Sequence, residues 1–473
     1  MTDLGILSLV PPMVAIALAI KTKQIIPSLI LGLLAGYWII TKDFLGGILS
    51  FIEGLVAVFS SAGNTRTVMF TLLIGALIQL IRISGGVNGF VRAVQGKILK
   101  SKSPKSNLQL AASLTGFLIF IESNISILTV GTVFRSLFDK FQLSRQKLAY
   151  IADSSSAPSC ILFPLNAWGA YIIGLLAVYE GISPFSVLLS SIPFNFYPIL
   201  TLIFVGYLAK TNKSFGPMKS FDNINPEVTQ ESQNEITNDS TGHAKEMLIP
   251  LAAMIVSMPL FLFYTGWSDA LVGSTSEKLW QAISDASGSA AVLYAVIFAL
   301  IVAGIQYGLQ GLVNLKGFFE EGLKGMEEMF TMAILMVLAF ALGDLCKELG
   351  TGIYVAKVSE AWLAPALAPA MLFITSCFIA FSTGTSWGTF AIMISIAVPL
   401  STALGIDVNL VVAAVLGGGV FGDHCSPISD TTLIASMASG SSHIDHVRTQ
   451  LPYALVTGGI SVVLYLITGF LMV

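Results

Sequence analysis

Two short polar runs interrupt long apolar stretches, one in each half of the chain. The first is Asp153–Ser159 (DSSSAPS) and the second is Asp423–Asp430 (DHCSPISD). Each run combines an acid, hydroxyl groups and a proline. Because hydrocarbon offers no water to a broken helix, such a break persists only where it lines a hydrated site enclosed by protein. One break in each half is typical of a secondary transporter.

Composition indicates a membrane protein. Of the 473 residues, 55% are hydrophobic and only 11% are charged, whereas soluble domains carry about 25% charged residues. This composition makes the lipid bilayer of the cell membrane the expected environment, and the net charge of −3 argues against a nucleic-acid partner. No basic cluster precedes the first apolar run, so we expect this run to be retained as a span. The four cysteines have no paired spacing, which argues against disulfides and a zinc site.

We predict an all-α polytopic membrane protein with about ten transmembrane helices. Eight apolar stretches are long enough, with tilt, to cross about 30 Å of hydrocarbon. They lie at 5–20, 25–41, 66–82, 185–209, 247–264, 289–308, 326–346 and 452–472. Two further segments, 147–179 and 409–438, contain the polar runs and are predicted to be discontinuous helices.

Two other stretches, 107–138 and 366–404, are too long for one crossing and carry a polar tip near the middle. The arms of the first are about 15 residues long, or roughly 22 Å of helix, which is short of a full crossing. Basic residues flank both of its ends, and positive residues favour the cytoplasm. We therefore predict two re-entrant hairpins.

The order of features repeats, which predicts an inverted-topology repeat. Residues 23–209 would form the first inverted repeat and residues 288–473 the second. An extra N-terminal span (1–22) precedes them. A cytoplasmic hydrophilic linker (210–246) and a connecting span with an outer loop (247–287) separate them. Since this topology places most of the 24 Lys and Arg residues in the cytoplasm, both termini are predicted to lie outside.

The second polar run is the main candidate site. Asp423 and Asp430 bracket Ser426, Pro427 and Ser429. Oxygen ligands around a carboxylate suit a hard cation such as sodium, or a proton. We predict a sodium ion at Asp423, Ser426 and Asp430, with Ser429 beside it. The alternative is that Asp423 only caps the second half-helix, but so polar a group is costly at membrane depth without a function.

The first run supplies the counterpart site. Its candidates for binding an ion or substrate are Asp153, Ser154, Ser155, Ser156 and, farther along, Asn166. The same capping role is the alternative reading of Asp153.

The hairpin tips complete the candidate set. Glu122, with Ser123 and Asn124, should reach mid-membrane, where a carboxylate suits alternate binding of a proton and sodium. The alternative is a neutral Glu122 that holds the hairpin turn. The opposing tip offers hydroxyl and amide groups from Thr383, Gly384, Thr385 and Ser386, or forms only a tight turn.

Histidines give a further candidate. His424, next to Asp423, could relay protons or orient the carboxylate, and a structural histidine is the alternative. We expect His443, Asp445, His446 and Arg448 in a solvated cytoplasmic loop.

Two sequence blocks carry a family resemblance. Gly422–Thr432 (GDHCSPISDTT) and Ser382–Phe390 (STGTSWGTF) resemble the strong blocks of the NhaC-type sodium/proton antiporter family. The resemblance implies an ion-transporter fold in which hairpins and broken helices meet at the centre. It also implies Na+ and H+ as coupling ions without a cofactor, and it is compatible with a homodimer. Members of the family also couple carboxylates or amino acids, including malate/lactate exchange, so an organic substrate stays open.

These observations predict a secondary active transporter, a sodium/proton antiporter whose intramembrane carboxylates bind Na+ or H+ in turn. The nearest alternative is a Na+- or H+-coupled carrier of a small carboxylate or amino acid, by symport or exchange. A remote alternative is an intramembrane aspartyl protease using Asp153 and Asp423, although the G-x-G-D motif is absent. We expect no enzymatic activity.

Overall fold

The protein is an all-helical bundle of membrane-spanning length. The computed structural model describes residues 4–472 except 23, 88, 91–102, 121, 165, 180, 222–241, 269–273, 275–277, 279–281, 283–285, 352–353, 355–357 and 359–363. Within these residues, nine helices are long and apolar enough to cross a membrane, or up to eleven spans if each of two bent pairs counts as one. The prediction of an all-α polytopic protein with about ten spans is confirmed.

The nine helices are distributed along the whole chain. They are η1–α1 (Gly5–Thr22), α4 (Ala62–Ile83), α14 (Ala244–Gly266), α16 (Gly288–Leu309), α18 (Phe330–Glu348), η4–α20 (Pro365–Thr383), α21 (Ser386–Leu404), α22 (Val408–Cys425) and α24 (His443–Met472). The bent pairs are α8 (Arg145–Leu162) with α9 (Ala167–Leu176), and α10–η2 (Pro184–Phe194) with α11 (Phe196–Thr211). The shorter helices are α2 (Ile25–Thr41), α3 (Phe44–Val58), α6 (Pro104–Leu118), α7 (Ser123–Lys140), α12 (Met218–Phe221), α17 (Leu315–Glu328) and α23 (Asp430–Ser439).

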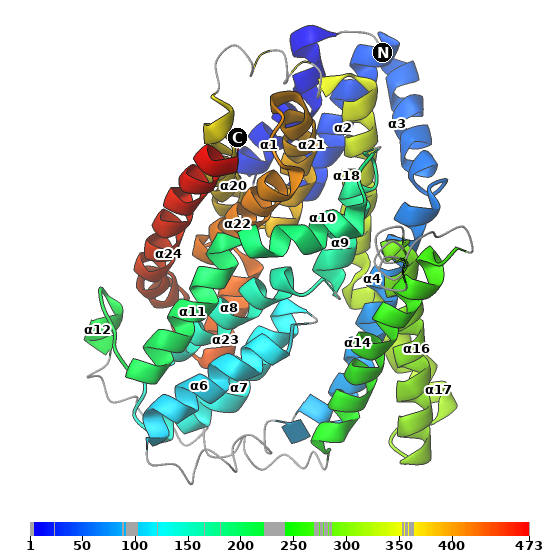
Figure 1. Cartoon of the computed structure of the whole chain (residues 1–473). Helices are drawn as coiled ribbons and strands as arrows, with labels where there is room; N and C mark the ends of the chain where they lie inside the picture. Colours follow the sequence, from blue (N-terminus) through cyan, green and yellow to red (C-terminus); the bar gives the residue numbers. More distant parts are fainter. Residues whose placement is uncertain are drawn as a thin grey trace.

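Both stretches predicted as hairpins are helix–turn–helix units. Helices α6 and α7 meet at the turn before Ser123, and α20 and α21 meet at Gly384 and Thr385. The α6–α7 pair occupies the lower half of the molecule and the α20–α21 pair the upper half, so the two pairs enter from opposite ends (Figure 1). Each arm of the second pair is also long enough to cross a membrane alone. The re-entrant topology of both pairs stays a prediction.

The second broken helix has the predicted break. Helix α22 ends at Cys425, residues 426–429 are non-helical, and α23 begins at Asp430. Pro427 cannot donate a backbone hydrogen bond, and it disfavours a helical conformation at Ser426, which is extended with ψ of 129°.

The predicted position of the first break was wrong. Helix α8 runs through Asp153–Ser159 to Leu162, and the bend of 43° follows it. Pro158 removes only one backbone hydrogen bond, which the helix tolerates. Pro164 instead stops the helix, because it forces the preceding Phe163 out of the helical region (φ −101°, ψ 112°). The side-chain amide of Asn166 then caps α9.

Other segments also differ from the prediction. The stretch 185–209 is not one straight span, because α10–η2 and α11 are bent by 47° around Asn195. Within the predicted linker, α12 and the start of α14 are helical, and 222–241 lies outside the described residues. The expected loop around His446 is the first turn of α24. The sequence did not predict α3 or α17 as separate helices.

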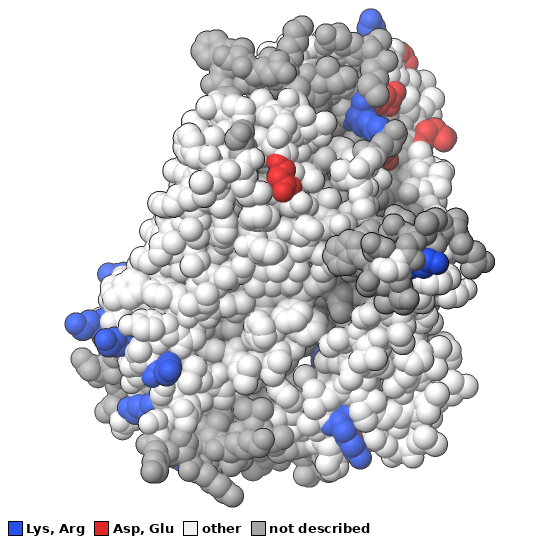
Figure 2. Space-filling model, in the orientation of Figure 1, with Lys and Arg blue, Asp and Glu red and all other residues white. Residues whose placement is uncertain are grey.

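The helix order favours the predicted repeat. From α2 to α11 the chain forms two single helices, α4, a hairpin, a broken helix and a closing helix, and this order recurs from α16 to α24. Both termini lie at the upper end of the molecule (Figure 1). Most Lys and Arg side chains visible in Figure 2 lie in the lower half of that face, whereas the visible acids lie in the upper half. The inverted repeat and the orientation of the termini stay predictions.

Helix α22 lies at the centre of the bundle. Of its apolar window 83% is buried, against 28–72% for the other eight candidate spans. Two glycines one turn apart allow α20 to approach it. A Cβ atom at Gly418 would lie 2.4 Å from the Phe373 carbonyl oxygen, and one at Gly422 would lie 2.3 Å from that of Cys377. Their missing side chains therefore set the distance between the two helices.

We predict that Gly418→Val or Gly422→Val destabilises the protein by about 1–3 kcal/mol or more, because the new side chain collides with backbone. Thermal unfolding in detergent, followed by size-exclusion chromatography, measures the effect. Gly459→Ala in α24 is the control, since a Cβ atom there has open space. Equal unfolding temperatures for the valine variants and the control would contradict this close packing.

Candidate ion-binding site

Among the described residues, the side-chain partners of the Asp423 carboxylate are all hydroxyl groups. Ser386 Oγ donates to Asp423 Oδ2 and Ser429 Oγ donates to Asp423 Oδ1, each at 2.6 Å. Thr431 Oγ1 lies 2.9 Å from Ser429 Oγ. Asp423 and the three hydroxyl residues are each at most 3% exposed. We call these four residues the Asp423 cluster.

Three elements bring the Asp423 cluster together. Asp423 is in the last turn of α22, Ser429 and Thr431 flank the start of α23, and Ser386 begins α21 at the second hairpin tip. The tip reaches the break because Gly384 adopts a left-handed conformation (φ +68°), where a Cβ atom would lie 2.8 Å from the Ile428 carbonyl oxygen. The hairpin and the broken helix therefore fit together through backbone contact.

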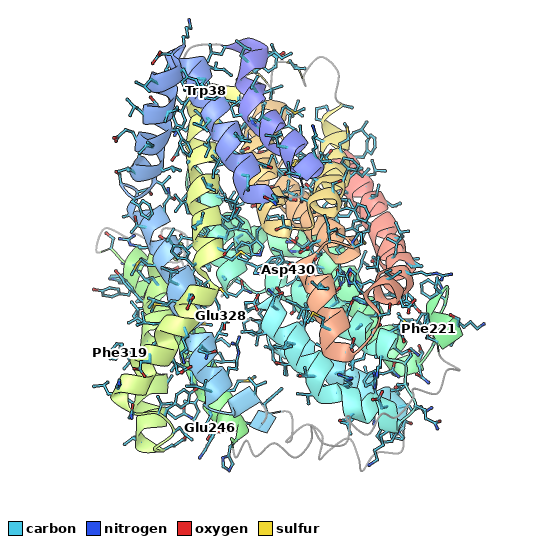
Figure 3. All side chains as sticks on the ribbon, turned by 180° about the vertical axis from the view of Figure 1, so that it is seen from behind. Trp38, Phe221, Glu246, Phe319, Glu328 and Asp430 are labelled. Atoms are coloured by element: carbon cyan, nitrogen blue, oxygen red, sulfur yellow. The ribbon has the colours of Figure 1, made fainter. Side chains whose placement is uncertain are left out.

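Two predicted sodium ligands point elsewhere. Ser426 Oγ donates to the Phe381 carbonyl oxygen at 2.7 Å rather than to a carboxylate. Asp430 Oδ2 accepts from Asn124 Nδ2 at 3.4 Å, and its Oδ1 accepts from the Thr431 amide at 3.0 Å. Asp430 nevertheless lies close enough to Asp423 for the two charges to interact. Figure 3 shows Asp430 near the centre of the molecule, between the upper bundle and the lower hairpin.

Asp153 lies in a second buried cluster with different partners. Gln450 Nε2 donates to Asp153 Oδ2 at 2.8 Å, and His446 Nε2 lies 3.4 Å from the same oxygen. His424 Nε2 lies 3.6 Å from Asp153 Oδ1. All four side chains are at most 2% exposed. We call these four residues the Asp153 cluster.

His424 faces away from its sequence neighbour Asp423. Its Nδ1 lies 2.9 Å from the Tyr197 hydroxyl of α11, and its Nε2 faces Asp153 of α8. Consecutive helical residues point about 100° apart, so α22 presents the two side chains to two different clusters. Among the described residues, His424 and Asp423 form no side-chain hydrogen bond with each other, so the structure does not support a direct relay between them, one of the expected roles.

The serines after Asp153 serve the helix rather than a common site. Ser155 Oγ donates to the Ile151 carbonyl, and Ser156 Oγ is bonded to Ala152 and to Ser126 Oγ of the first hairpin. Ser154 Oγ is buried and has no hydrogen-bond partner among the described residues. Asn166 joins the break to the hairpin, because its Nδ2 donates to the carbonyls of Cys160 and Phe120.

The first hairpin tip is held by its acid. Glu122 Oε2 caps α7 by accepting from the Ile125 amide at 2.8 Å, and Ser123 Oγ lies 3.4 Å from Oε1. Glu122 also lines a small cavity of about 30 Å³ between α4, α14 and this tip. Asn124 contacts Asp430, so this tip also reaches the second broken helix. The geometry agrees with a turn-holding role, and an ion-binding role stays a prediction.

At the second tip only Ser386 reaches a carboxylate. Thr383 Oγ1 donates to the Ile379 carbonyl of its own helix, and Thr385 precedes α21 without a side-chain cap bond. Trp387 packs against Trp168 of α9 at 5.4 Å between ring centroids, so the tip also contacts the first broken helix.

Sequence reasoning missed Thr431, His446 and Gln450 as site residues. His446 was expected in a solvated loop, but it is 0% exposed on α24. His446 and Gln450 are four residues apart and therefore lie on one face of α24. This spacing, directly before an apolar span, was the available signal. In the described part of the chain, no group of three His, Cys, Asp or Glu side chains has an arrangement that could hold a metal ion.

A helical bundle with nine to eleven candidate spans around two buried carboxylate clusters is the architecture of a membrane transporter. The sequence matches the Na+/H+ antiporter family over residues 159–470, and the chain belongs to this family. It is therefore a secondary transporter, and the aspartyl protease alternative is set aside.

The chain is similar to proteins from several organisms. An uncharacterized protein of Haemophilus influenzae is 31% identical over 98% of this chain and 91% of its own. The arginine/ornithine antiporter ArcD of Halobacterium salinarum is 29% identical over 38% of this chain and 36% of its own. The Na+/H+ antiporter NhaC of Alkalihalophilus pseudofirmus is 29% identical over 37% of each chain. The YdaH transporter structure of Alcanivorax borkumensis shares the fold, with a TM-score of 0.60 at 14% identity over 90% of this chain and 89% of its own.

We predict that Asn166→Ala destabilises the protein by about 2–4 kcal/mol, because it removes a helix cap and leaves two buried carbonyls unpaired. Thermal unfolding in detergent measures this loss. Asn314→Ala is the matched control, since Asn314 caps α17 through one bond to Gly317 at 2.7 Å and should cost about 1 kcal/mol. If the two variants unfold at the same temperature, Asn166 does not fasten the break to the hairpin.

Proposed function

We propose that the protein exchanges Na+ for H+ and that Asp423 binds the sodium ion. The observation that carries this proposal is the environment of Asp423, a buried carboxylate whose side-chain partners in the described part of the chain are all hydroxyl oxygens. Oxygen ligands suit a hard cation. Ser386 and Ser429 keep lone pairs that can face an ion when their hydrogens turn away.

Competition between the two ions would produce the exchange. A carboxylate in a site closed to water is costly as a bare charge, so it holds either a cation or a proton. Release of sodium on one side would then require that Asp423 takes up a proton. Because Asp423 must always hold either sodium or a proton, the movements of the two ions are linked.

The origin of the ligands favours alternating access. Ser386 comes from the second hairpin and Ser429 from the broken helix, so a small relative movement of these elements would open the Asp423 cluster. In Figure 1 the hairpins and broken helices lie on one side, and α4, α14, α16 and α17 on the other. We propose that the first group moves against the second. We also propose that the lower end of the molecule in Figure 1 faces the cytoplasm, because most Lys and Arg side chains visible in Figure 2 lie in the lower half.

An organic substrate is the second candidate. The relative ArcD is named as an exchanger of arginine and ornithine, so amino acids or small carboxylates are the solutes to test if sodium alone is not exchanged.

We predict sodium-driven proton movement in liposomes. The protein is reconstituted with a pH-sensitive dye inside and an imposed proton gradient, and sodium chloride is added outside without any organic solute. The wild type should collapse the gradient. Asp423→Asn should abolish the response, because the neutral amide of asparagine neither balances the charge of sodium nor takes up a proton. No response of the wild type would refute the proposed exchange. Labelled arginine, ornithine and small carboxylates would then be offered.

We predict that Ser386→Ala and Ser429→Ala each raise the sodium concentration for half-maximal exchange about 10- to 100-fold. The estimate follows from losing one hydrogen bond to a charged group, worth about 1.5–3 kcal/mol. Ser395→Ala is the control on the same helix as Ser386, since Ser395 Oγ donates to the Ile392 carbonyl and lies outside the Asp423 cluster. Unchanged half-maximal concentrations in both alanine variants would exclude these hydroxyls as sodium ligands.

A further inference from the structure

We propose that an anionic phospholipid binds to a group of lysines at the ends of α6 and α11 and in the residues that follow α11. The proposal goes beyond the proposed exchange and does not depend on which ion is moved. The phosphate group of the lipid would lie against the lysines, and an acyl chain would follow the outer face of α11. We call the exposed lysines of this group the basic patch: Lys105, Lys210, Lys213 and Lys219.

Hydrogen bonds between α6 and the end of α11 bring the basic patch together. Ser106 Oγ of α6 donates to the carbonyl oxygen of Lys210 at 2.7 Å. Gln109 Nε2, also of α6, donates to Asn212 Oδ1 at 2.8 Å. Several Lys and Arg side chains gather at the lower left of Figure 2, over the region where Figure 1 shows α6, α11 and α12. No Asp or Glu side chain is visible among them.

The positive charge of the basic patch is not balanced by acids. Helix α6, helix α11 and residues 212–221 contain no Asp or Glu. Within the described part of the chain, none of the four patch lysines forms an ion pair. By contrast, three basic residues on α4 and α17 are each paired with a glutamate: Arg82 with Glu328, Lys316 with Glu320, and Lys324 with Glu321. Unbalanced lysines at a membrane surface attract anionic lipids.

Lys105 lies where a positive charge is unfavourable. It is the second residue of α6, and the N-terminus of a helix favours negative groups. Lys210 suits the last turn of α11, but that effect does not account for Lys105. A bound phosphate would offset the unfavourable charge at Lys105 and the repulsion among the patch lysines.

The outer face of α11 connects the basic patch to an apolar surface. Ile203, Tyr207 and Lys210 are all exposed, and their spacing places them on one face of the helix. An apolar residue, an aromatic residue and a lysine in this order are typical of a helix that passes from the hydrocarbon to the membrane surface. Lys210 would therefore lie at the level of the lipid headgroups. Because a soluble anion has no apolar part to place along Ile203, this arrangement favours a phospholipid.

A small cavity beneath the basic patch supplies a further partner for the phosphate. Its volume is about 10 Å³, and Lys147, Lys213 and Ser214 contribute to its lining. Lys147 is only 6% exposed, and Ser214 Oγ is buried without a hydrogen-bond partner in the described structure. A space of this size admits about one water-sized group. One phosphate oxygen would accept from Ser214 Oγ there, while the rest of the headgroup stays outside with Lys210 and Lys213.

Lipid-dependent thermal unfolding of the purified full-length protein tests the site. The protein in a neutral detergent receives increasing amounts of phosphatidylglycerol or, separately, of phosphatidylcholine. Phosphatidylglycerol should raise the unfolding temperature in a saturable way and at lower concentration than phosphatidylcholine. Inorganic phosphate and glycerol 3-phosphate, offered without lipid, should leave the unfolding temperature unchanged at the same concentrations.

A double variant and a matched control locate the effect. Lys210→Gln with Lys213→Gln should raise the half-maximal phosphatidylglycerol concentration about 25-fold, or about 5-fold for each lysine. Lys316→Gln with Lys324→Gln removes the same two charges from exposed lysines of α17. This control should keep the wild-type half-maximal concentration.

Ser214→Ala separates lipid binding from folding. Because Ser214 Oγ has no partner in the described structure, the variant should unfold at the wild-type temperature in phosphatidylcholine. It should need about 10- to 100-fold more phosphatidylglycerol for the half-maximal effect, because a hydrogen bond to a charged phosphate is lost.

Four outcomes would contradict the proposal. Equal responses to the two lipids would exclude a site for anionic phospholipid, and equal losses in the double variant and its control would exclude the basic patch. A wild-type response of Ser214→Ala would exclude the cavity from the site. If inorganic phosphate alone stabilises the protein and competes with phosphatidylglycerol, the ligand is a soluble phosphate and the lipid proposal fails. None of these outcomes affects the proposed exchange of sodium for protons.

Discussion

The hydrogen bonds from Ser386 and Ser429 to Asp423 connect the second hairpin to both halves of the second broken helix. A carboxylate in the interior of a bilayer has no water to bind, so its partners must come from protein. Here they come from a hairpin tip and from the start of a second half-helix. Two features of the backbone bring these partners to Asp423. Gly384 lies in close contact with the chain near Ile428, and the residues after Cys425 are non-helical.

Helix α22 carries this arrangement because it combines three properties. Its glycines let α20 approach its backbone, its burial removes it from lipid, and its last turn directs Asp423 and His424 toward different neighbours. A helix with larger side chains at Gly418 or Gly422 could not lie so close to the hairpin. The glycines that allow close packing and the side chains of Asp423 and His424 therefore depend on the same position of α22 in the bundle.

Much of the architecture follows from sequence alone, because hydropathy and polar interruptions act locally. The break at residues 426–429 was predictable from Pro427 and its polar neighbours. The first break was misplaced because Pro158 and Pro164 look alike in sequence, and only the extended conformation of Phe163 distinguishes their effects. Family membership was also accessible, since two short blocks carried the resemblance that the comparison confirms.

Contacts between distant segments could not be predicted in this way. Polar residues just before an apolar span look like a loop, so the spacing of His446 and Gln450 placed them on one helix face but did not show that His446 is buried beside Asp153. Likewise, the linear sequence does not indicate which partners Asp423 and its neighbour His424 each contact. Such facts depend on which helices pack together, and that is decided by the whole bundle.

The partners of Asp153 also constrain how the protein is made. His446 follows Asp153 by 293 residues, which at about 5–20 residues per second takes roughly 15–60 s to synthesise. During that interval α8 must enter the bilayer with an acid whose final partners do not yet exist. The nascent helix therefore has to insert with Asp153 protonated or facing water, and a chain truncated before α24 would carry an incomplete centre that quality-control proteases could recognise.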